Sequence, residues 1–186
     1  MADTTTGATP GRSRMVTGLF RDRDSAESAY GSLASRGYSQ DDVNLMMSDK
    51  TRDTYFKDDK DKKNDGAPDL GDKAWEDAGK GAAIGGGVGA TIAAIAAIGT
   101  TLALPGLGLL IAGPLAAGIA GAGAGGLTGG LIGALVGHGI PEDRAKEYDK
   151  GIRDGGILMG VNARSDEDAE YFENQFRTNR GESVYR

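Results

Sequence analysis

Short apolar runs and amphipathic stretches alternate on both sides of a long uncharged block. On the N-terminal side, Met15–Phe20 and Val43–Ser48 are apolar runs whose length suits β-strands. Between them, small and apolar side chains recur at helical spacing. Asp24 and Glu27 form an Asp-x-x-Glu pattern that is typical of the start of a helix. Gly37 stands where a glycine commonly ends a helix. This side therefore predicts a β-α-β unit with parallel strands and a right-handed crossover.

The C-terminal side continues the alternation in the order α-β-α. Residues 141–154 have helical spacing, and Pro141 suits the first turn of a helix. Residues 157–163 form a third strand-like run, and Ser165 opens a last amphipathic stretch that Gly181 ends. The apolar faces predicted for the helices are Ala26, Ala29, Tyr30 and Leu33, then Ala145, Tyr148 and Ile152, then Ala169, Phe172 and Phe176.

Neither side alone has enough strands for a convincing core, so we expect the two to fold together. The predicted fold class is α/β, a small split α/β sandwich (β-α-β … α-β-α) interrupted by a glycine-zipper α-helical hairpin. The expected organisation is a disordered N-terminus at 1–14, a first half-domain at 15–48, a charged linker at 49–79, the hairpin at 80–139 and a second half-domain at 140–186. Such an insertion requires the two ends of the hairpin to lie close together.

The hairpin is predicted from the uncharged block. Residues 81–137 contain no Asp, Glu, Lys or Arg, which leaves room for two helical passes of about 20 residues each. Turn signals lie near the middle of the block, at 104–106 and 113–114. Two passes return the chain to the side on which it started, as a split domain needs.

The limits of the two predicted helices follow from these turns. We expect the first helix near residues 80–104 and the second to end near Gly137. The second helix begins either after Pro105, with a kink at Pro114, or at Pro114 itself.

Small residues recur at every fourth position in both predicted helices. The stripe runs through Gly81, Gly85, Gly89, Ala93, Ala97, Gly121, Gly125, Gly129, Gly133 and Gly137. Because glycine costs about 1 kcal/mol per residue relative to alanine in an exposed helix, the stripe needs a cause other than helix propensity. In a bilayer the backbone must satisfy its own hydrogen bonds, and small side chains let two helices approach closely. We interpret the stripe as a glycine zipper that packs helices and drives homo-oligomerisation.

Two environments fit such a zipper. In the first, the hairpin associates with a membrane through transmembrane helices, and Lys73, Lys80, Arg144 and Lys146 at its outer ends place both termini in the cytoplasm. In the second, glycine and alanine contribute too little insertion energy, and the hairpins of a water-soluble scaffold are buried between subunits. A zipper pore is a third and weaker alternative, because the block offers few polar side chains for a lumen.

Composition argues against several classes of function. The net charge is −6 and the pI is about 4.8, which disfavours general binding to nucleic acid. The chain has no cysteine and its one histidine is His138, so the usual ligand sets for transition metals are missing. We interpret His138 as an interfacial residue at the end of the second helix, with a proton-sensitive gate as the alternative. No arrangement of side chains indicates catalysis, so we expect no enzyme activity, no cofactor, no metal and no small-molecule substrate.

Several segments resemble one protein family. They read VTGLFRDRDSAESA at 16–29, GYS at 37–39, DVNL at 42–45, GIPEDRAKEY at 139–148 and GGILMGV at 155–161. These segments are similar to the bacterial general stress, or heat-induced stress, protein domain family and to low-temperature-induced proteins, some of which carry a glycine-zipper insertion. The resemblance implies a stress-responsive bacterial protein without established catalytic residues, so no active site is carried over.

The function predicted from the sequence is that of a non-enzymatic bacterial stress-response protein. In the leading hypothesis, the glycine-zipper hairpin associates with the lipid bilayer of the inner membrane and joins copies of the chain into a homo-oligomer. The alternative is a water-soluble cytoplasmic assembly in which the same hairpins bury one another. Fractionation without detergent separates the two hypotheses.

Overall fold

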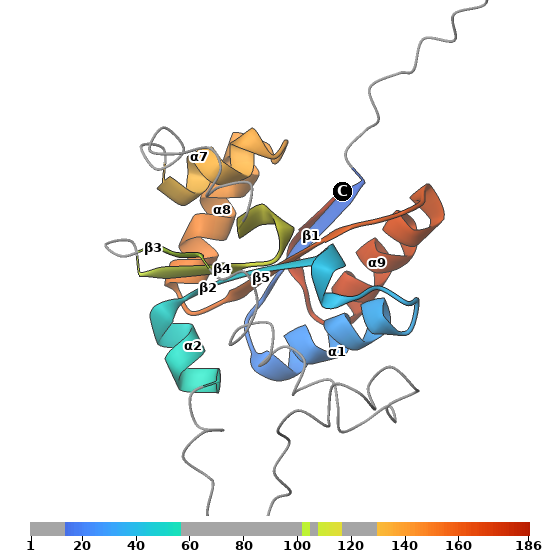
Figure 1. Ribbon diagram of the computed structural model, residues 1–186, viewed down its shortest axis with the longest axis horizontal. Coiled ribbons are helices and arrows are strands. Elements are labelled where there is room, and N and C mark those ends of the chain that lie inside the picture. Colours follow the sequence, from blue (N-terminus) through green and yellow to red (C-terminus); the bar gives the residue numbers. More distant parts are fainter. Residues whose placement is uncertain (1–13, 57–101, 105–107, 117–129) are drawn as a thin grey trace, which may run out of the picture.

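The computed structural model describes residues 14–56, 102–104, 108–116 and 130–186. Its strands form one sheet in the order β3-β4-β2-β5-β1-β6, with helices on both faces (Figure 1). The strands are β1 (Met15–Phe20), β2 (Val43–Ser48), β3 (Leu102–Leu104), β4 (Leu109–Ala112), β5 (Ile157–Asn162) and β6 (Glu182–Tyr185). The described helices are α1 (Arg23–Ala34), α2 (Asp49–Phe56), α7 (Gly130–Gly137), α8 (Glu142–Arg153) and α9 (Asp166–Thr178), and a short 3-10 turn, η1 (Gln40–Asp42), precedes β2. The α/β class predicted from the sequence is confirmed.

β1 and β2 run in the same direction, but they are not neighbours in the sheet. β5 lies between them and pairs antiparallel with both, so that Met159 stands opposite Gly18 on one side and Leu45 on the other. β5 and β6 likewise run in the same direction, and β1 lies between them and pairs antiparallel with both. The connections through α1 and α9 are therefore two interlocking split β-α-β units, as in ferredoxin-like domains. Strands from the two sides of the uncharged block thus share one sheet.

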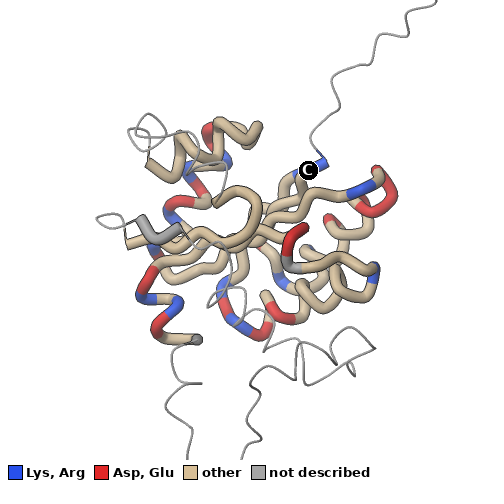
Figure 2. The backbone as a smooth tube through the Cα atoms, viewed as in Figure 1, with Lys and Arg blue, Asp and Glu red and all other residues tan. Residues whose placement is uncertain are grey.

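Because helices cover both faces of the sheet, the central strands are buried on both sides. One set of alternate strand residues packs against α1 and α9, and the other set packs against α7 and α8 (Figure 1). The first core includes Val16, Phe20, Leu45, Met47 and Met159, and the second includes Met15, Leu19, Met46, Ile111 and Leu158. Every helix residue predicted to face a core is buried, from Ala26 to Phe176. Charged residues surround the uncharged central strands on the helices and loops (Figure 2).

Side-chain caps begin α1 and α9. The Ser165 hydroxyl accepts the N–H of Asp168 at 3.0 Å, which confirms the predicted start of α9. α1 starts earlier than predicted, because Asp22 rather than Asp24 is its cap and accepts the N–H of Ser25 at 2.8 Å. This hydrogen bond lowers the pKa of Asp22. A carboxylate there also interacts favourably with the positive end of the helix dipole.

Four helices end with a residue in the left-handed backbone region. For α1, α7 and α8 these residues are Gly37, Gly139 and Gly155, with φ angles of 75°, 87° and 99°. α9 instead uses Arg180, with φ 63°, one residue before the glycine predicted to end it. The N–H of Gly181 donates to the carbonyl oxygen of Phe176 at 2.7 Å, and that of Arg180 donates to Arg177 at 3.1 Å, the paired bonds of a Schellman motif. A side chain in this region costs roughly 1–2 kcal/mol, so the connection from α9 to β6 is strained.

Part of the uncharged block forms strands where the sequence predicts helix. Leu102–Leu104 is β3 rather than the end of the first helix, and β3 forms a hairpin with β4. β4 in turn pairs with β2. The physical reason is that a short apolar run fits a buried strand as well as a helix, and the free edge of β2 supplies a partner. A second helix that begins after Pro105 is therefore excluded, whereas residues 114–116 are helical and α7 ends at Gly137 as predicted.

α2 follows β2 directly and extends the folded part of the chain to Phe56. Arg23, at the start of α1, donates from Nη1 to the carbonyl oxygen of Tyr55 at 2.7 Å and ties α2 to α1. The first part of the stretch predicted as a charged linker is thus helical. The rest of that linker, residues 57–79, and the predicted N-terminal disorder at 1–13 lie outside the described residues.

Candidate functional site

α7 carries the described part of the small-residue stripe. Gly133 and Gly137 are exposed, and a Cβ atom added to either would meet no atom of the described residues within 4 Å. On the other side of the helix, Leu131 and Leu135 are buried in the core shared with α8 and the sheet. α7 therefore has one side anchored to the domain and one side open.

We call the open side of α7, formed by Gly133, Val136 and Gly137, the open face. Val136 is 42% exposed, and among the described residues it is the large apolar side chain left on the surface. A face with so little side-chain volume lets a second helix approach closely. The other stripe positions, at 81–97 and 121–129, lie outside the described residues, and their packing stays a prediction. Across the described ranges, no helix combines the length and the apolar character that a bilayer crossing needs.

Asn44 anchors the segment that follows β4. Its Oδ1 accepts the N–H of Leu115 at 2.8 Å, in the helical turn that begins at Pro114. Gly113 has φ 96° and lies so close to β2 that a Cβ atom there would stand 2.2 Å from the carbonyl oxygen of Val43. A side chain at Gly113 would therefore push the segment off the strand. These contacts fix the point at which the block leaves the sheet.

Thr17, Gly160 and Asn44 form a row across β1, β5 and β2, facing α7 and α8. Beside this row lies a cavity of about 10 Å³, which Leu115 and Leu135 also line. Ligand pockets commonly measure 300–1,000 Å³, so this cavity is far too small for a metabolite. Among the described residues, the Asn44 amide nitrogen is the buried side-chain polar atom without a hydrogen-bond partner. The row marks the joint between the inserted block and the sheet.

Tyr148 links α8 to both β1 and β6. Its hydroxyl donates to the carbonyl oxygen of Ser183 at 2.7 Å, and it accepts from the Thr17 hydroxyl at 2.8 Å. Burial raises the pKa of Tyr148 to about 12, although the hydrogen bond from Thr17 acts in the opposite direction. The hydroxyl is therefore protonated at neutral pH. Its hydrogen bonds hold the last strand in place.

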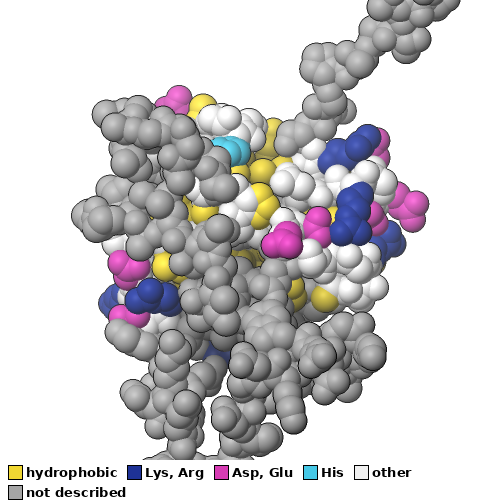
Figure 3. All heavy atoms as spheres, viewed as in Figure 1, with side chains coloured by type: hydrophobic (Ala, Val, Ile, Leu, Met, Phe, Trp, Pro, Cys, Tyr) yellow, Lys and Arg dark blue, Asp and Glu magenta, His cyan; other side chains and the backbone are white. Residues whose placement is uncertain are grey.

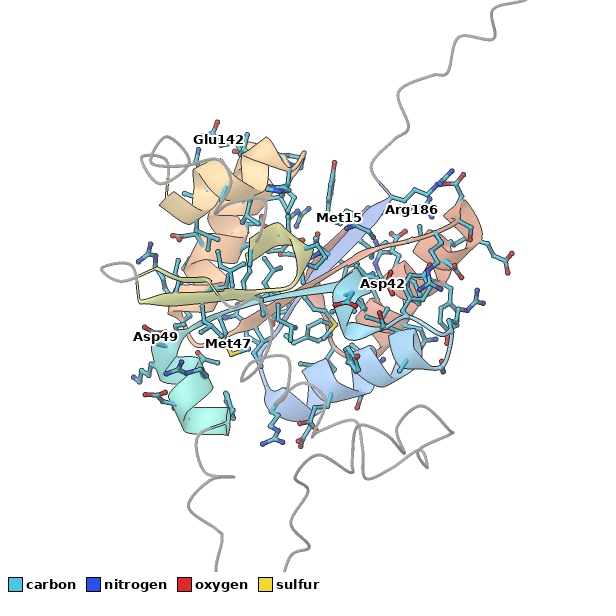
Figure 4. All side chains as sticks on the ribbon, in the orientation of Figure 1. Met15, Asp42, Met47, Asp49, Glu142 and Arg186 are labelled. Carbon is cyan, nitrogen blue, oxygen red and sulfur yellow. The ribbon has the colours of Figure 1, made fainter. Side chains whose placement is uncertain are left out.

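A charged cluster joins the end of α1 to the start of α9. The Tyr38 hydroxyl donates to Asp168 Oδ2 at 2.7 Å and accepts the N–H of Arg164 at 2.7 Å. Arg36 donates to Asp168 Oδ1 at 2.6 Å, and Arg164 donates to Asp42, labelled in Figure 4, at 2.9 Å. The hydrogen bonds from Tyr38 and Arg36 hold the pKa of Asp168 below its usual value. Because each charge here faces an opposite charge, the cluster acts as a structural tie.

His138 lies at the C-terminal end of α7. Its Nδ1 donates to the carbonyl oxygen of Ala134 at 2.9 Å, since a carbonyl oxygen can only accept. Figure 3 shows the histidine side chain at the surface. Among the described residues, no three His, Asp or Glu side chains are placed to hold a metal ion.

Comparisons with known proteins found no match among family models, curated proteins or solved structures. The resemblance noted from the sequence therefore stays a prediction. Sequence reasoning did not single out Thr17 or Asn44, although each is a polar residue inside an apolar strand run. That pattern is the one available signal for them, and it does not reveal that they flank the same glycine.

Proposed function

We propose that the chain is a non-enzymatic bacterial stress-response protein that self-associates through the open face of α7 and the adjoining uncharged block. The observation that carries the proposal is the contrast within α7, where Leu131 and Leu135 are buried while Cβ atoms at Gly133 and Gly137 would meet no atom of the described residues within 4 Å. Each exposed helical glycine costs about 1 kcal/mol relative to alanine. A second helix packed on this face offsets that cost, because backbones without side chains can pack closely.

Chain length favours a water-soluble assembly over a membrane-spanning hairpin. The block is tied to the sheet at β3 and β4, through the buried Leu115 and Ala116, and again at α7. Residues 117–129, between the last two ties, are too few for a helical crossing, which needs about 17–25 residues. Residues 81–101 suffice for one crossing, but an odd number of crossings would leave α2 and β3 on opposite sides of the bilayer. Residues 57–80 are too highly charged to supply the return crossing.

We therefore propose a cytoplasmic assembly, in which the open face of α7 and the parts of the uncharged block that are not held by the sheet pack between subunits. The stress-response role rests on the resemblance of the segments at 16–29, 37–39, 42–45, 139–148 and 155–161 to the bacterial stress-protein family. A structural role is further supported by Tyr148 and Asp168, because both are engaged in hydrogen bonds that tie elements together.

Attachment to the inner membrane is the second candidate. The absence of charged side chains from residues 81–137 favours it. Both termini would then remain in the cytoplasm, and the block would associate with the lipid from that side. Co-flotation of the chain with phospholipid vesicles distinguishes this candidate from an assembly held together by protein contacts alone.

Leucine placed on the open face tests self-association. The double variant Gly133→Leu, Gly137→Leu is expected to lower the mass of the detergent-free oligomer, measured by size exclusion with light scattering, because the new side chains hold a second helix away. Its far-UV circular dichroism should match that of the wild type, since both positions are open in the domain. Lys146→Leu, which adds the same side chain at an exposed position of α8, is the matched control and should leave the mass unchanged.

Two results would contradict the proposal. One is a double variant with the same mass as the wild type, and the other is a wild type that is monomeric at every concentration. If the wild type floats with vesicles and the double variant does not, the result would favour membrane attachment over the soluble assembly.

A further inference from the structure

The last strand of the sheet follows a short and strained connection. α9 ends at Thr178 and β6 begins at Glu182, so residues 179–181 alone reverse the chain. Within the described chain, the non-glycine residues with positive φ are Arg180 at 63° and Ser183 at 51°. Residues other than glycine are strained in this region. Both strained residues therefore belong to the connection or to the strand that it leads into.

β6 forms few residue pairs with β1. Thr17 stands opposite Tyr185 and Leu19 stands opposite Glu182. Since β6 advances three residues where β1 advances two, the pairing contains a bulge, and Ser183 lies within it. β6 is an edge strand whose residues are exposed or half-buried, whereas β1 is buried throughout.

Side chains of other elements hold β6 in place. The Tyr148 hydroxyl donates to the carbonyl oxygen of Ser183 at 2.7 Å. The Ser183 hydroxyl donates to Glu147 Oε2 at 2.8 Å, and Arg21 Nε donates to Glu182 Oε2 at 2.8 Å. None of these contacts involves the connection that precedes the strand. A β6 strand from a second copy of the chain can make all of them in the same way.

We propose that β6 exchanges between two copies of this chain to form a strand-swapped dimer. In the exchanged form the connection is extended, so Arg180 leaves the left-handed region while β6 keeps the same partners on the other copy. A short, strained hinge before an edge strand favours such an exchange. The Schellman hydrogen bonds of Arg180 and Gly181 oppose it, as does the entropy lost on association. This contact between copies does not involve the open face of α7, so either can fail without the other.

Two substitutions of Arg180 are expected to shift the equilibrium between monomer and dimer in opposite directions. Arg180→Gly removes the strain from the closed connection and should raise the dimer dissociation constant by about tenfold or more. Arg180→Pro cannot adopt a positive φ, so it should lower that constant by at least a similar factor. Analytical ultracentrifugation over a range of concentrations measures both. A glycine variant with an unchanged dissociation constant, or a folded proline variant that stays monomeric, overturns the proposal.

Cross-linking tests the exchange without altering the hinge. The chain has no cysteine, so Arg21→Cys in one copy and Glu182→Cys in another introduce the only thiols, at side chains that form a 2.8 Å ion pair across β1 and β6. After the two variants are refolded together, a short bis-maleimide should join them into a heterodimer. Lys50→Cys, on the exposed surface of α2, mixed with Glu182→Cys is the control for random encounters. A heterodimer yield no higher than in this control overturns the proposal, even if Arg180→Pro does not fold.

Discussion

Tyr148 shows how one buried hydroxyl can serve several elements. It belongs to α8, accepts a hydrogen bond from Thr17 on β1 and donates to Ser183 on β6. Ser183 lies in the bulge of β6, and its carbonyl oxygen accepts the hydrogen bond from the tyrosine. The cost of leaving the buried Thr17 hydroxyl and the partly buried Ser183 carbonyl without a partner thus explains why a polar group lies in this apolar core.

Removing this hydroxyl should weaken the domain. We expect Tyr148→Phe to lower the free energy of unfolding by about 1–3 kcal/mol, because two hydrogen-bonding groups lose their partner. Since the pKa of Tyr148 is raised to about 12 from the usual 10.0 of a tyrosine, its contribution is present below pH 10 and is lost as the pH rises towards 12. Urea unfolding at pH 7 and at pH 11 measures both effects. A variant as stable as the wild type at pH 7 would show that the hydrogen bonds contribute nothing.

Asp168 should control part of the acid stability. Its pKa is lowered in the folded chain by the hydrogen bonds from Tyr38 and Arg36, so its carboxylate stabilises the fold above the unfolded value of 3.8, and this contribution is lost as the pH falls through the folded value. We therefore expect Asp168→Asn to lose less stability than the wild type between about pH 5 and pH 2. Thermal unfolding across this range tests the expectation, with Glu170→Gln on the same helix as the control. An equal loss of stability on acidification for Asp168→Asn and the wild type would contradict it.

Caps illustrate which residues can be read from a sequence. Ser165 and Gly37 were predicted because their signals are local, a hydroxyl three residues before its N–H partner and a glycine after an amphipathic stretch. The cap of α1 was misplaced because Asp22 and Asp24 both suit that role. The tertiary position of β1, which ends at Phe20, leaves Asp22 extended and free to accept the N–H of Ser25.

α7 is an element whose two sides have opposite roles. The side with Leu131 and Leu135 holds it to the second core, and the side with Gly133 and Gly137 is open. The four-residue spacing of the glycines was visible in the sequence. The direction in which this stripe faces is set by the core in which Leu131 and Leu135 are buried.

Single substitutions on the two sides of α7 should have opposite effects on the monomer. Leu135→Ala is expected to cost about 2–5 kcal/mol of unfolding free energy, because it leaves a cavity beside α8. Gly133→Ala should raise the free energy of unfolding by up to about 1 kcal/mol, since its Cβ meets no atom in the described part of the chain and alanine favours helix. Chemical denaturation of dilute protein measures both. A destabilising Gly133→Ala would mean that the face is closely packed already in the monomer.

β3 was predicted as the end of the first helix, and β4 was predicted either in the second helix or in the turn before it. Residues 102–112 are apolar and uncharged, so neither period 2 nor period 3.6 stands out. The open edge of β2 supplies hydrogen-bond partners for β4, and the sheet then buries Leu109 and Ile111. β4 is therefore a strand because it pairs with β2, more than 60 residues away along the chain. Ile111, for example, stands opposite Met46.

The whole sheet should unfold from its edges. β5 lies at its centre, between β1 and β2, whereas β3 and β6 each have one strand neighbour among the described residues. We expect hydrogen–deuterium exchange to be slowest at Leu158 and Met159 in β5 and fastest in β3 and β6, because local opening needs fewer broken contacts at an edge. Mass spectrometry of exchanged peptides measures this order. Equal protection in β5 and β6 would contradict the ready release of the last strand.

Apolar periodicity and capping residues were enough to locate β1, α1, β2, α8, β5 and α9, because those signals act between residues a few positions apart. The order of the strands could not be read in the same way. Thr17, Gly160 and Asn44 meet across β1, β5 and β2, and the last strand returns to β1 through a strained Arg180. Hydrogen bonds and packing between distant segments set these arrangements, and the energy of such contacts exists only once the chain has folded.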